Sequence, residues 1–296
     1  MTAKPTVTLE VDDIQAPLLH PRPAHYTGTV ILGRIDDRRD GRELVRRLIS
    51  FVPSASGPLD PDRKAWAAVA LSFQGLKALG VPEDTLANFP QEFQQGMAAR
   101  AADLGDTGES APENWEPPLG GPDVHLAIYA LAPDPPSPEE VIAGARDALR
   151  EIPGVAPIWL QDTYMLPTER TSLGFKDSIS HPAIEGSGIP ATNPHEEPFK
   201  AGEFVLGYPN GNGELPQMPQ PEVLGRNGSY VVVRKLQTRV AAFRQYVRAH
   251  AKSQAEEELL AAKFVGRWPS GAPLVLAPER DDPELGADPE RQRLSL

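Results

Sequence analysis

The sequence predicts an α+β fold: a ferredoxin-like β-α-β-β-α-β unit with an antiparallel sheet, followed by an incomplete second ferredoxin-like unit. Four apolar runs have the length and composition of strands. Helical periodicity follows the first and third runs, and a long insertion separates the second from the third. In the ferredoxin-like arrangement, helices cover one face of the sheet. We expect strands at residues 27–34, 66–72, 124–131 and 158–166.

The first β-α pair begins with the run TGTVILGR at residues 27–34. Asp40 follows it as a candidate helix N-cap. Leu44, Leu48 and Phe51 then repeat at helical spacing. A short amphipathic helix is therefore predicted after the first strand.

The middle of the chain carries the insertion and the second helix of the unit. Residues 73–103 have a helical pattern, and a Pro/Gly-rich loop follows at residues 105–122. A capping box with proline at the first helical position is formed by Ser137, Pro138, Glu139 and Glu140. The helix that it opens presents Val141, Ala145 and Leu149 on one face.

The second half repeats this pattern only in part. Residues 186–225 are dense in glycine and proline and predict an ordered surface connector. A strand is predicted at residues 229–233 (SYVVV), followed by a helix with Leu236, Val240, Phe243 and Val247 on one face. A second capping box, from Ser253 to Glu256, precedes another apolar helix face. Beyond Leu276 the charged, proline-spaced sequence shows no helix or strand pattern.

These elements predict four regions. Residues 1–24 form an N-terminal lead, and residues 25–168 form the first ferredoxin-like domain. Residues 169–225 form a loop and connector, and residues 226–296 form a partial second domain with a charged tail.

Composition excludes several classes of function. With 41 acidic and 29 basic residues the net charge is -12, which disfavours binding to nucleic acid or anionic membranes. The absence of cysteine excludes disulfides, iron–sulfur clusters and thiolate nucleophiles. The sequence shows neither a signal-peptide pattern nor an apolar run of membrane-spanning length. We expect a cytoplasmic protein that is not bound to a membrane.

The most informative segment is LGFKDSISHP, residues 173–182. Asp177 lies between a glycine and small polar residues, so a loop could present its carboxylate to a flat ligand. An Asx-turn without a catalytic role is the alternative interpretation.

Four stretches of the chain resemble the dye-decolorizing (DyP-type) haem peroxidases, and the likeness is greatest to their long bacterial subgroup. The stretches are LGFKDSISHPAIEGSG, AGEFVLGY, GRNGSYVVVRKL, and the long run from AAKFVGRWPSGAPLVL to ELGADP. The resemblance implies two ferredoxin-like units around haem b. It implies an oxidoreductase that uses hydrogen peroxide to oxidise dyes, phenols or other organic electron donors.

The resemblance also implies a site. The family pattern Gly-x-x-Asp-Gly reads here from Gly174 to Ser178, so Asp177 matches the distal acid that moves a proton between the two peroxide oxygens. The residues implied to lie at the haem are Gly174, Phe175, Asp177, Ser178 and Ser180. Ser178 replaces the second glycine and is expected to need a backbone conformation that glycine adopts more easily.

No residue of this chain matches the family's iron ligand, an axial histidine in a His-x-Arg segment beyond the Gly-Ala-Pro-Leu motif. The motif ends here at Leu274, and the six histidines at positions 20, 25, 125, 181, 195 and 250 all precede it. Arg267 is expected to form a structural ion pair rather than to replace the family's distal arginine. The alternative to an active peroxidase is therefore a truncated or split chain. Such a chain would be non-enzymatic, or would need a partner chain that supplies the axial histidine and distal arginine; a homo-oligomer is a further expectation.

Overall fold

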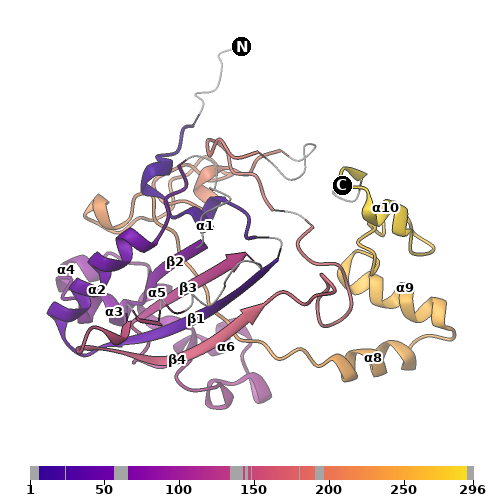
Figure 1. Cartoon of the computed structure of the whole chain (residues 1–296), viewed down its shortest axis with the longest axis horizontal. Helices are drawn as coiled ribbons and strands as arrows, with labels where there is room; N and C mark the ends of the chain where they lie inside the picture. Colours follow the sequence, from indigo (N-terminus) through magenta and orange to yellow (C-terminus); the bar gives the residue numbers. More distant parts are fainter. Residues whose placement is uncertain are drawn as a thin grey trace, which may run out of the picture. The chain divides into compact units, whose positions relative to one another are not determined.

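The structure is a computed structural model, which describes residues 7–23, 25–56, 66–133, 143, 146–147, 149–179, 181–190 and 197–291. It divides into two compact units (Figure 1). Unit 1 comprises Met1–Tyr164 and Lys200–Val231, and unit 2 comprises Met165–Phe199 and Val232–Leu296. Each unit is described by itself below.

Unit 1 is built on a four-stranded antiparallel sheet with the order β2-β3-β1-β4 (Figure 1). The strands are β1 (Tyr26–Ile35), β2 (Trp66–Leu71), β3 (Leu126–Pro133) and β4 (Val155–Tyr164). The central strand β1 pairs Ile31 with Ile128 of β3 and with Leu160 of β4. This order is that of a ferredoxin-like unit, so the predicted antiparallel α+β fold is confirmed.

Helix α2 (Arg38–Phe51) follows β1 and covers one face of the sheet. Its N-cap is Asp37, whose side chain accepts the amides of Arg39 and Asp40. The predicted cap, Asp40, is wrong, because it lies in the first turn and accepts the Gly154 amide at 2.9 Å. Leu44 of α2 is fully buried in the hydrophobic core. Burial of one such side chain contributes about 1.5–3 kcal/mol.

The core on this face combines both sheet and helix residues. Its largest contributors are Ile31, Ile35, Leu44, Leu48, Leu126, Ile128, Leu149, Ile152 and Val155. Leu149, predicted on the second helix, is buried as expected. The predicted capping box of that helix at residues 137–140, with Val141 and Ala145, lies outside the described residues.

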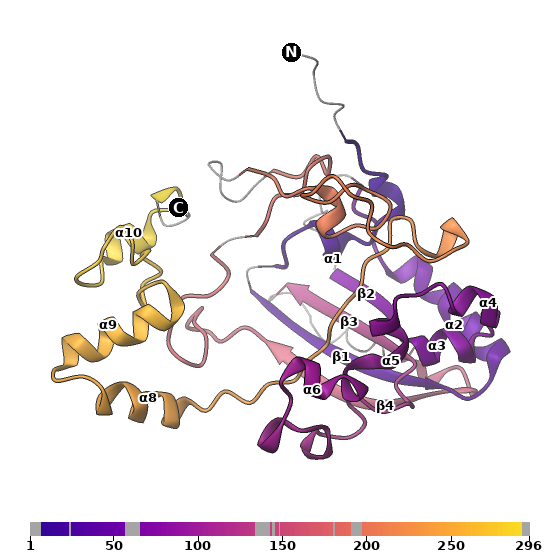
Figure 2. The same cartoon turned by 180° about the vertical axis from the view of Figure 1, so that it is seen from behind.

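The insertion between β2 and β3 forms four short helices, α3 (Phe73–Ala78), α4 (Glu83–Leu86), α5 (Gln91–Ala99) and α6 (Ala101–Leu104). Two 3-10 turns follow, Gly108–Ser110 and Pro112–Asn114. α5 and α6 lie on the sheet face opposite to α2 (Figure 2). The expectation of helices on one face is thus wrong for the insertion. Its apolar residues form a cluster of their own around Leu76, Leu86 and Phe89.

The N-terminal segment contains a 3-10 turn, Val11–Asp13, and helix α1 (Ala16–Leu19). Between them, the Gln15 side chain meets the outer edge of β2. Its amide group donates to the Val69 carbonyl and accepts the Val69 amide, each at 2.9 Å.

The connector, residues 200–231, contains the 3-10 turns Ala201–Glu203 and Glu222–Leu224. Arg226 donates two hydrogen bonds to the Glu10 carboxylate. Asn227 donates to Glu10 and to Asp13, both at 2.9 Å, and accepts the Tyr208 hydroxyl at 2.8 Å. These bonds tie the N-terminal segment to the connector.

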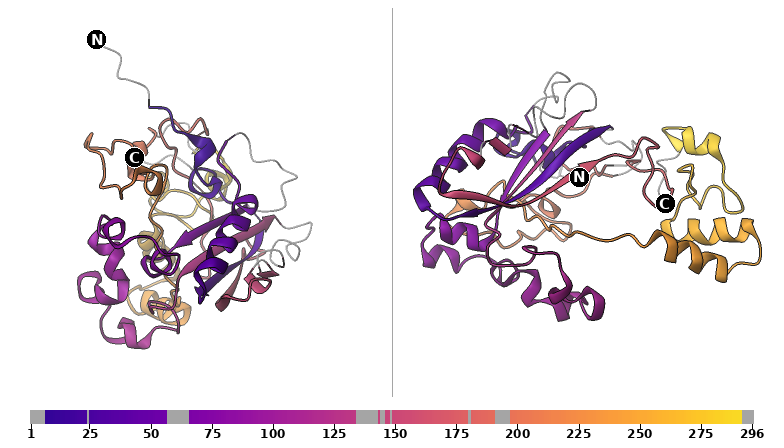
Figure 3. Two further views of the ribbon diagram at one scale, coloured as in Figure 1. Left: turned by 90° about the vertical axis from the view of Figure 1, so that its left-hand side faces the viewer. Right: turned by 60° about the horizontal axis from the view of Figure 1, so that its bottom comes forward.

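Unit 2 contains α8 (Val240–Ala249), α9 (Gln254–Val265) and α10 (Pro283–Ala287). α8 and α9 run side by side as a helical hairpin (Figure 3). The predicted capping box is confirmed in part, since the Ser253 side chain accepts the Glu256 amide. A small core joins α9, α10 and the loop between them through Ala262, Trp268, Ala272 and Leu285.

Two sequence predictions fail in this region. Residues 229–233 have no regular secondary structure and pair with no strand in the described part of the chain. A strand needs a hydrogen-bonded neighbour, and this segment has none there. Val231 and Val232 are accordingly exposed. Residues beyond Leu276 do contain a helix, α10, which begins at the side-chain cap Asp282 with proline at the next position.

No helix within the described ranges has the length and apolar character needed to cross a membrane.

Candidate functional site

Asp177 follows a tight hairpin turn in unit 2. Arg170 and Lys176 face each other as an isolated antiparallel bridge. The Thr171 amide donates to the Phe175 carbonyl at 2.8 Å, and the Asp177 amide donates to the Glu169 carbonyl at 3.0 Å. Within the turn Gly174 has a φ of 96°. Glycine suits this position because side chains with a Cβ rarely adopt that conformation.

The Asp177 carboxylate is oriented by the backbone that follows it. Its Oδ1 accepts the Ser178 amide at 2.7 Å. Ser178 has a φ of 57°, which is in the left-handed region. Residues other than glycine rarely adopt this backbone conformation. As the sequence indicated, a serine stands where glycine would be unstrained. This bond from the amide of the next residue holds one oxygen of the carboxylate in place.

The other predicted haem-site residues differ in their surroundings. Phe175 is only 4% exposed, so protein already encloses its ring. Gly174 is half-buried and Ser178 is exposed. Ser180 lies outside the described residues.

The GRWPSGAPL motif forms a compact loop beneath the Asp177 turn. The Trp268 amide donates to the Ala272 carbonyl at 2.9 Å, and its indole donates to the Ala277 carbonyl at 2.6 Å. Arg267 donates to the Gly271 carbonyl at 3.0 Å, which closes the loop. Partial burial lowers the pKa of the Arg267 guanidinium. The bond to the Gly271 carbonyl gives Arg267 a structural contact within this loop.

Glycine is required in this loop by close packing as well as by backbone conformation. Gly271 has a φ of 97°. A Cβ on Gly271 would lie 2.9 Å from Lys176 Cδ and 3.2 Å from Ile179 Cδ1. The loop and the segment that carries Asp177 therefore touch directly.

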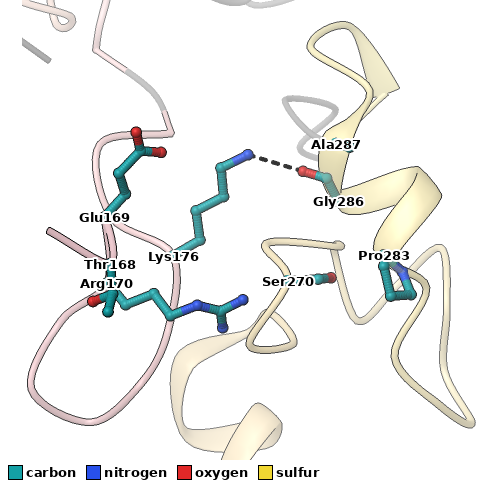
Figure 4. A pocket seen from close by; sticks show the side chains of 8 residues that line it. All are labelled: Thr168, Glu169, Arg170, Lys176, Ser270, Pro283, Gly286 and Ala287. Carbon is teal, nitrogen blue, oxygen red and sulfur yellow. Dashed lines mark hydrogen bonds between the residues drawn. The ribbon is translucent and has the colours of Figure 1, made fainter.

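A pocket of about 250 Å³ lies between the Asp177 turn and the 270–287 segment (Figure 4). Its lining residues are Thr168, Glu169, Arg170, Lys176, Ser270, Pro283, Gly286 and Ala287. The side chains of Arg170 and Lys176 extend across it, and Lys176 Nζ donates to the Gly286 carbonyl at 3.0 Å. The pocket is polar and smaller than the roughly 300–1,000 Å³ of typical cofactor sites, and Asp177 does not line it. It does not fit a porphyrin.

Three described histidines are engaged by the protein itself. His20 bonds to the Ala55 carbonyl at 3.1 Å, and His125 accepts the Ile35 amide at 3.0 Å. His250 is the C-cap of α8 and bonds to the Tyr246 carbonyl at 2.8 Å. The described residues contain no cluster of three or more histidines and carboxylates that could hold a metal ion. The described residues therefore show no cluster of metal ligands beside Asp177.

The chain is similar in sequence and structure to known proteins of one family. Residues 60–142 match the DyP dimeric alpha+beta barrel domain. An ancestral D-type dye-decolorizing peroxidase has a similar structure, with a TM-score of 0.77 and 28% identity over 97% of this chain and 64% of that one. A decolorizing peroxidase from Auricularia auricula-judae gives a TM-score of 0.80 and 26% identity, covering 96% of this chain and 62% of that one.

Curated relatives agree with the structural neighbours. Peroxidase 2 of Mycetinis scorodonius is 29% identical over 98% of this chain and 56% of its own length. A dye-decolorizing peroxidase of the same fungus is 32% identical over 75% of this chain and 43% of its own length. The chain thus spans about half the length of the curated relatives it matches. Together the matches strongly support the DyP-type peroxidase family for this chain.

The structure also reveals residues that sequence reasoning did not select. Arg170 donates to the carbonyls of Gly174 and Pro269. Lys176 donates to the carbonyl of Gly286. Such bonds have no sequence signature, because any residue offers the same carbonyl acceptor. The only signal was two basic residues flanking the turn in an acidic protein.

Proposed function

We propose that this chain functions as a DyP-type haem peroxidase. Such an enzyme uses hydrogen peroxide to oxidise dyes, phenols or similar electron donors. The observation that carries the proposal is the Asp177 turn, in which the matching acid is held by the Ser178 amide at 2.7 Å. A related dye-decolorizing peroxidase, 25% identical, has been solved with 2,6-dimethoxyphenol, which supports a phenolic donor here.

Asp177 is the proposed acid and base. Its carboxylate would accept a proton from one oxygen of hydrogen peroxide and return it to the other. A general base must be fixed within hydrogen-bonding reach of that proton. The bonds from the Asp177 amide to the Glu169 carbonyl and from the Ser178 amide to Oδ1 supply such fixation.

Haem b is the proposed cofactor, and the family likeness supports haem. In this proposal Gly174, Phe175, Asp177, Ser178 and Ser180 lie on its distal side. Haem iron is held by His, Cys, Tyr or Met, yet no described residue is assigned to it.

A second candidate follows from this missing ligand. A partner chain, or further sequence, would supply the axial histidine and the distal arginine, and the chain alone would be non-enzymatic. The bonds that already engage His20, His125 and His250 favour this version.

The remaining proposals concern context. We propose a cytoplasmic location, which fractionation of the producing cells tests. We also propose that the chain belongs with the long bacterial subgroup of the DyP-type peroxidases. The relatives reported above are fungal or ancestral D-type proteins.

A haem titration of the purified 296-residue chain tests the function. We expect weak binding, a Soret band without histidine ligation, and dye oxidation near background. Adding the matched C-terminal half of a DyP-type protein should restore activity, and Asp177→Asn should abolish the restored activity. Asp123→Asn, on an exposed turn of unit 1, is the matched control.

Two outcomes would contradict these expectations. A stoichiometric, histidine-ligated and active haem in the chain alone would show that the iron ligand is present after all. Restored activity that survives Asp177→Asn would remove Asp177 as the acid.

A further inference from the structure

The Asp177 turn is fastened to the GRWPSGAPL loop through one carbonyl, that of Pro269. This oxygen accepts the Lys176 amide at 3.2 Å and Arg170 Nη1 at 2.5 Å. A carbonyl oxygen has two lone pairs and can accept both bonds. The residue before Asp177 is thereby bonded to a loop about 90 positions further along the chain.

Arg170 adds a second bond within the turn itself. The same Nη1 donates to the Gly174 carbonyl at 2.9 Å. Because this nitrogen carries two hydrogens, one planar guanidinium can bond to the turn and to the loop at once. Arg170 thus joins the turn, at Gly174, to the loop, at the Pro269 carbonyl.

The loop that receives these bonds is held by contacts on both sides of Pro269. Trp268, immediately before Pro269, is 1% exposed and belongs to the core of unit 2. On the other side, Ser270 donates its hydroxyl to Asp281, and its amide donates to the same carboxylate at 3.2 Å. A carbonyl held between two fixed residues is a firm attachment point for a surface turn.

We infer that Arg170 is a positioning residue for Asp177, because its guanidinium holds the acid-bearing turn on the Pro269 carbonyl. The inference rests on the proposed role of Asp177 and deepens it. It also gives the GRWPSGAPL motif a function in the site: the motif is the platform on which the turn sits.

Amide hydrogen exchange of the full chain tests this inference without requiring haem or activity. In Arg170→Gln the protection of the Lys176 and Asp177 amides should fall at least about fivefold, because both bonds of the guanidinium are lost and one net hydrogen bond already contributes about that factor. The Gly266 amide, which caps α9 by bonding to the Ala262 carbonyl, should keep its protection. A purely global effect on unit 2 would lower all three together.

Two further variants complete the design. Arg170→Lys keeps the charge and one reachable donor, so it should recover part of the lost protection. Arg244→Gln removes an exposed arginine of α8 in the same unit and should change nothing at the turn.

Unchanged protection at Lys176 and Asp177 in Arg170→Gln overturns the inference. If Arg170→Gln fails to fold, Arg170→Lys decides: a selective loss at these two amides supports positioning, and wild-type protection overturns it. The result is separable from the proposed function, because Asp177→Asn tests the acid while leaving Arg170 in place.

Discussion

The sheet of unit 1 and the Asp177 turn of unit 2 are stabilised in different ways. In the sheet, β1 is bonded along its length to β3 and β4, and one face is closed by a core that includes Ile31, Leu44 and Ile128. The turn is held by a few bonds, most of them from side chains or amides to single carbonyls. The sheet is stabilised by many contacts, so the loss of one should change it little. The position of the Asp177 carboxylate depends instead on a few individual contacts.

The largest effect is expected from Trp268→Ala. Removing this fully buried indole should cost about 3–5 kcal/mol, because it leaves a cavity and unpairs the Ala277 carbonyl. Denaturant-dependent hydrogen exchange should show early opening of the Gly266 amide in unit 2 and unchanged β1 amides in unit 1. Tyr246→Ala, an exposed aromatic of α8, is the control. Equal loss in both units would show that they unfold as one and would end the comparison.

A smaller effect is expected at the turn from Ser178→Gly. The left-handed conformation costs a residue with a Cβ about 1–2 kcal/mol, and glycine avoids this cost. The entropy that glycine loses on folding offsets about 0.5–1 kcal/mol of the gain, so the folded turn should be stabilised by the difference. The Asp177 and Ser178 amides should gain protection from exchange by up to about tenfold. Ser178→Ala keeps the Cβ and should bring no gain. An equal gain in both variants would point to loss of the hydroxyl instead of relief of the backbone.

The smallest effect is expected at the surface network of unit 1. Hydrogen bonds from Arg226 and then from Asn227 lower the pKa of Glu10 below its ordinary value of 4.5. Because the folded-state pKa is lowered, the stabilisation is present above pH 4.5 and is lost as pH falls through the lowered value. Besides Arg226, the charged groups in this network are Asp13 and Glu222.

The side-chain amide resonance of Asn227 should therefore shift on acidification, and Glu10→Gln should largely abolish this shift. The side-chain amide of Asn114, which donates to the Gly108 carbonyl, serves as the control. A shift that persists in Glu10→Gln would show that Glu10 is not its source.

Sequence reasoning succeeded where a pattern repeats along an element. The strands of unit 1 were predicted to within a few residues, because the apolar run of a buried strand is long and is bounded by turns. The helix cap was misplaced from Asp37 to Asp40, since both residues precede the apolar face and only the backbone distinguishes them. Residues 229–233 have a strand's composition, but composition does not supply a neighbouring strand.

The site was predicted only in part for a similar reason. The sequence pointed to Asp177 and to the conformational demand at Ser178 because a motif carries both. It did not point to Arg170, whose partners are the Gly174 and Pro269 carbonyls. Contacts of a side chain with distant backbone depend on tertiary structure and leave no periodic trace.

The Gln15 side chain covers part of the outer edge of β2, where a strand of another molecule could pair. An outer strand with open amides and carbonyls is a template on which another chain can add a strand and begin a fibre. At Val69 of β2 both backbone groups are already occupied by the Gln15 amide, each at 2.9 Å. An incoming strand would have to break both bonds before it could pair there. A single glutamine thus occupies, at this position of β2, the two backbone groups that strand addition would use.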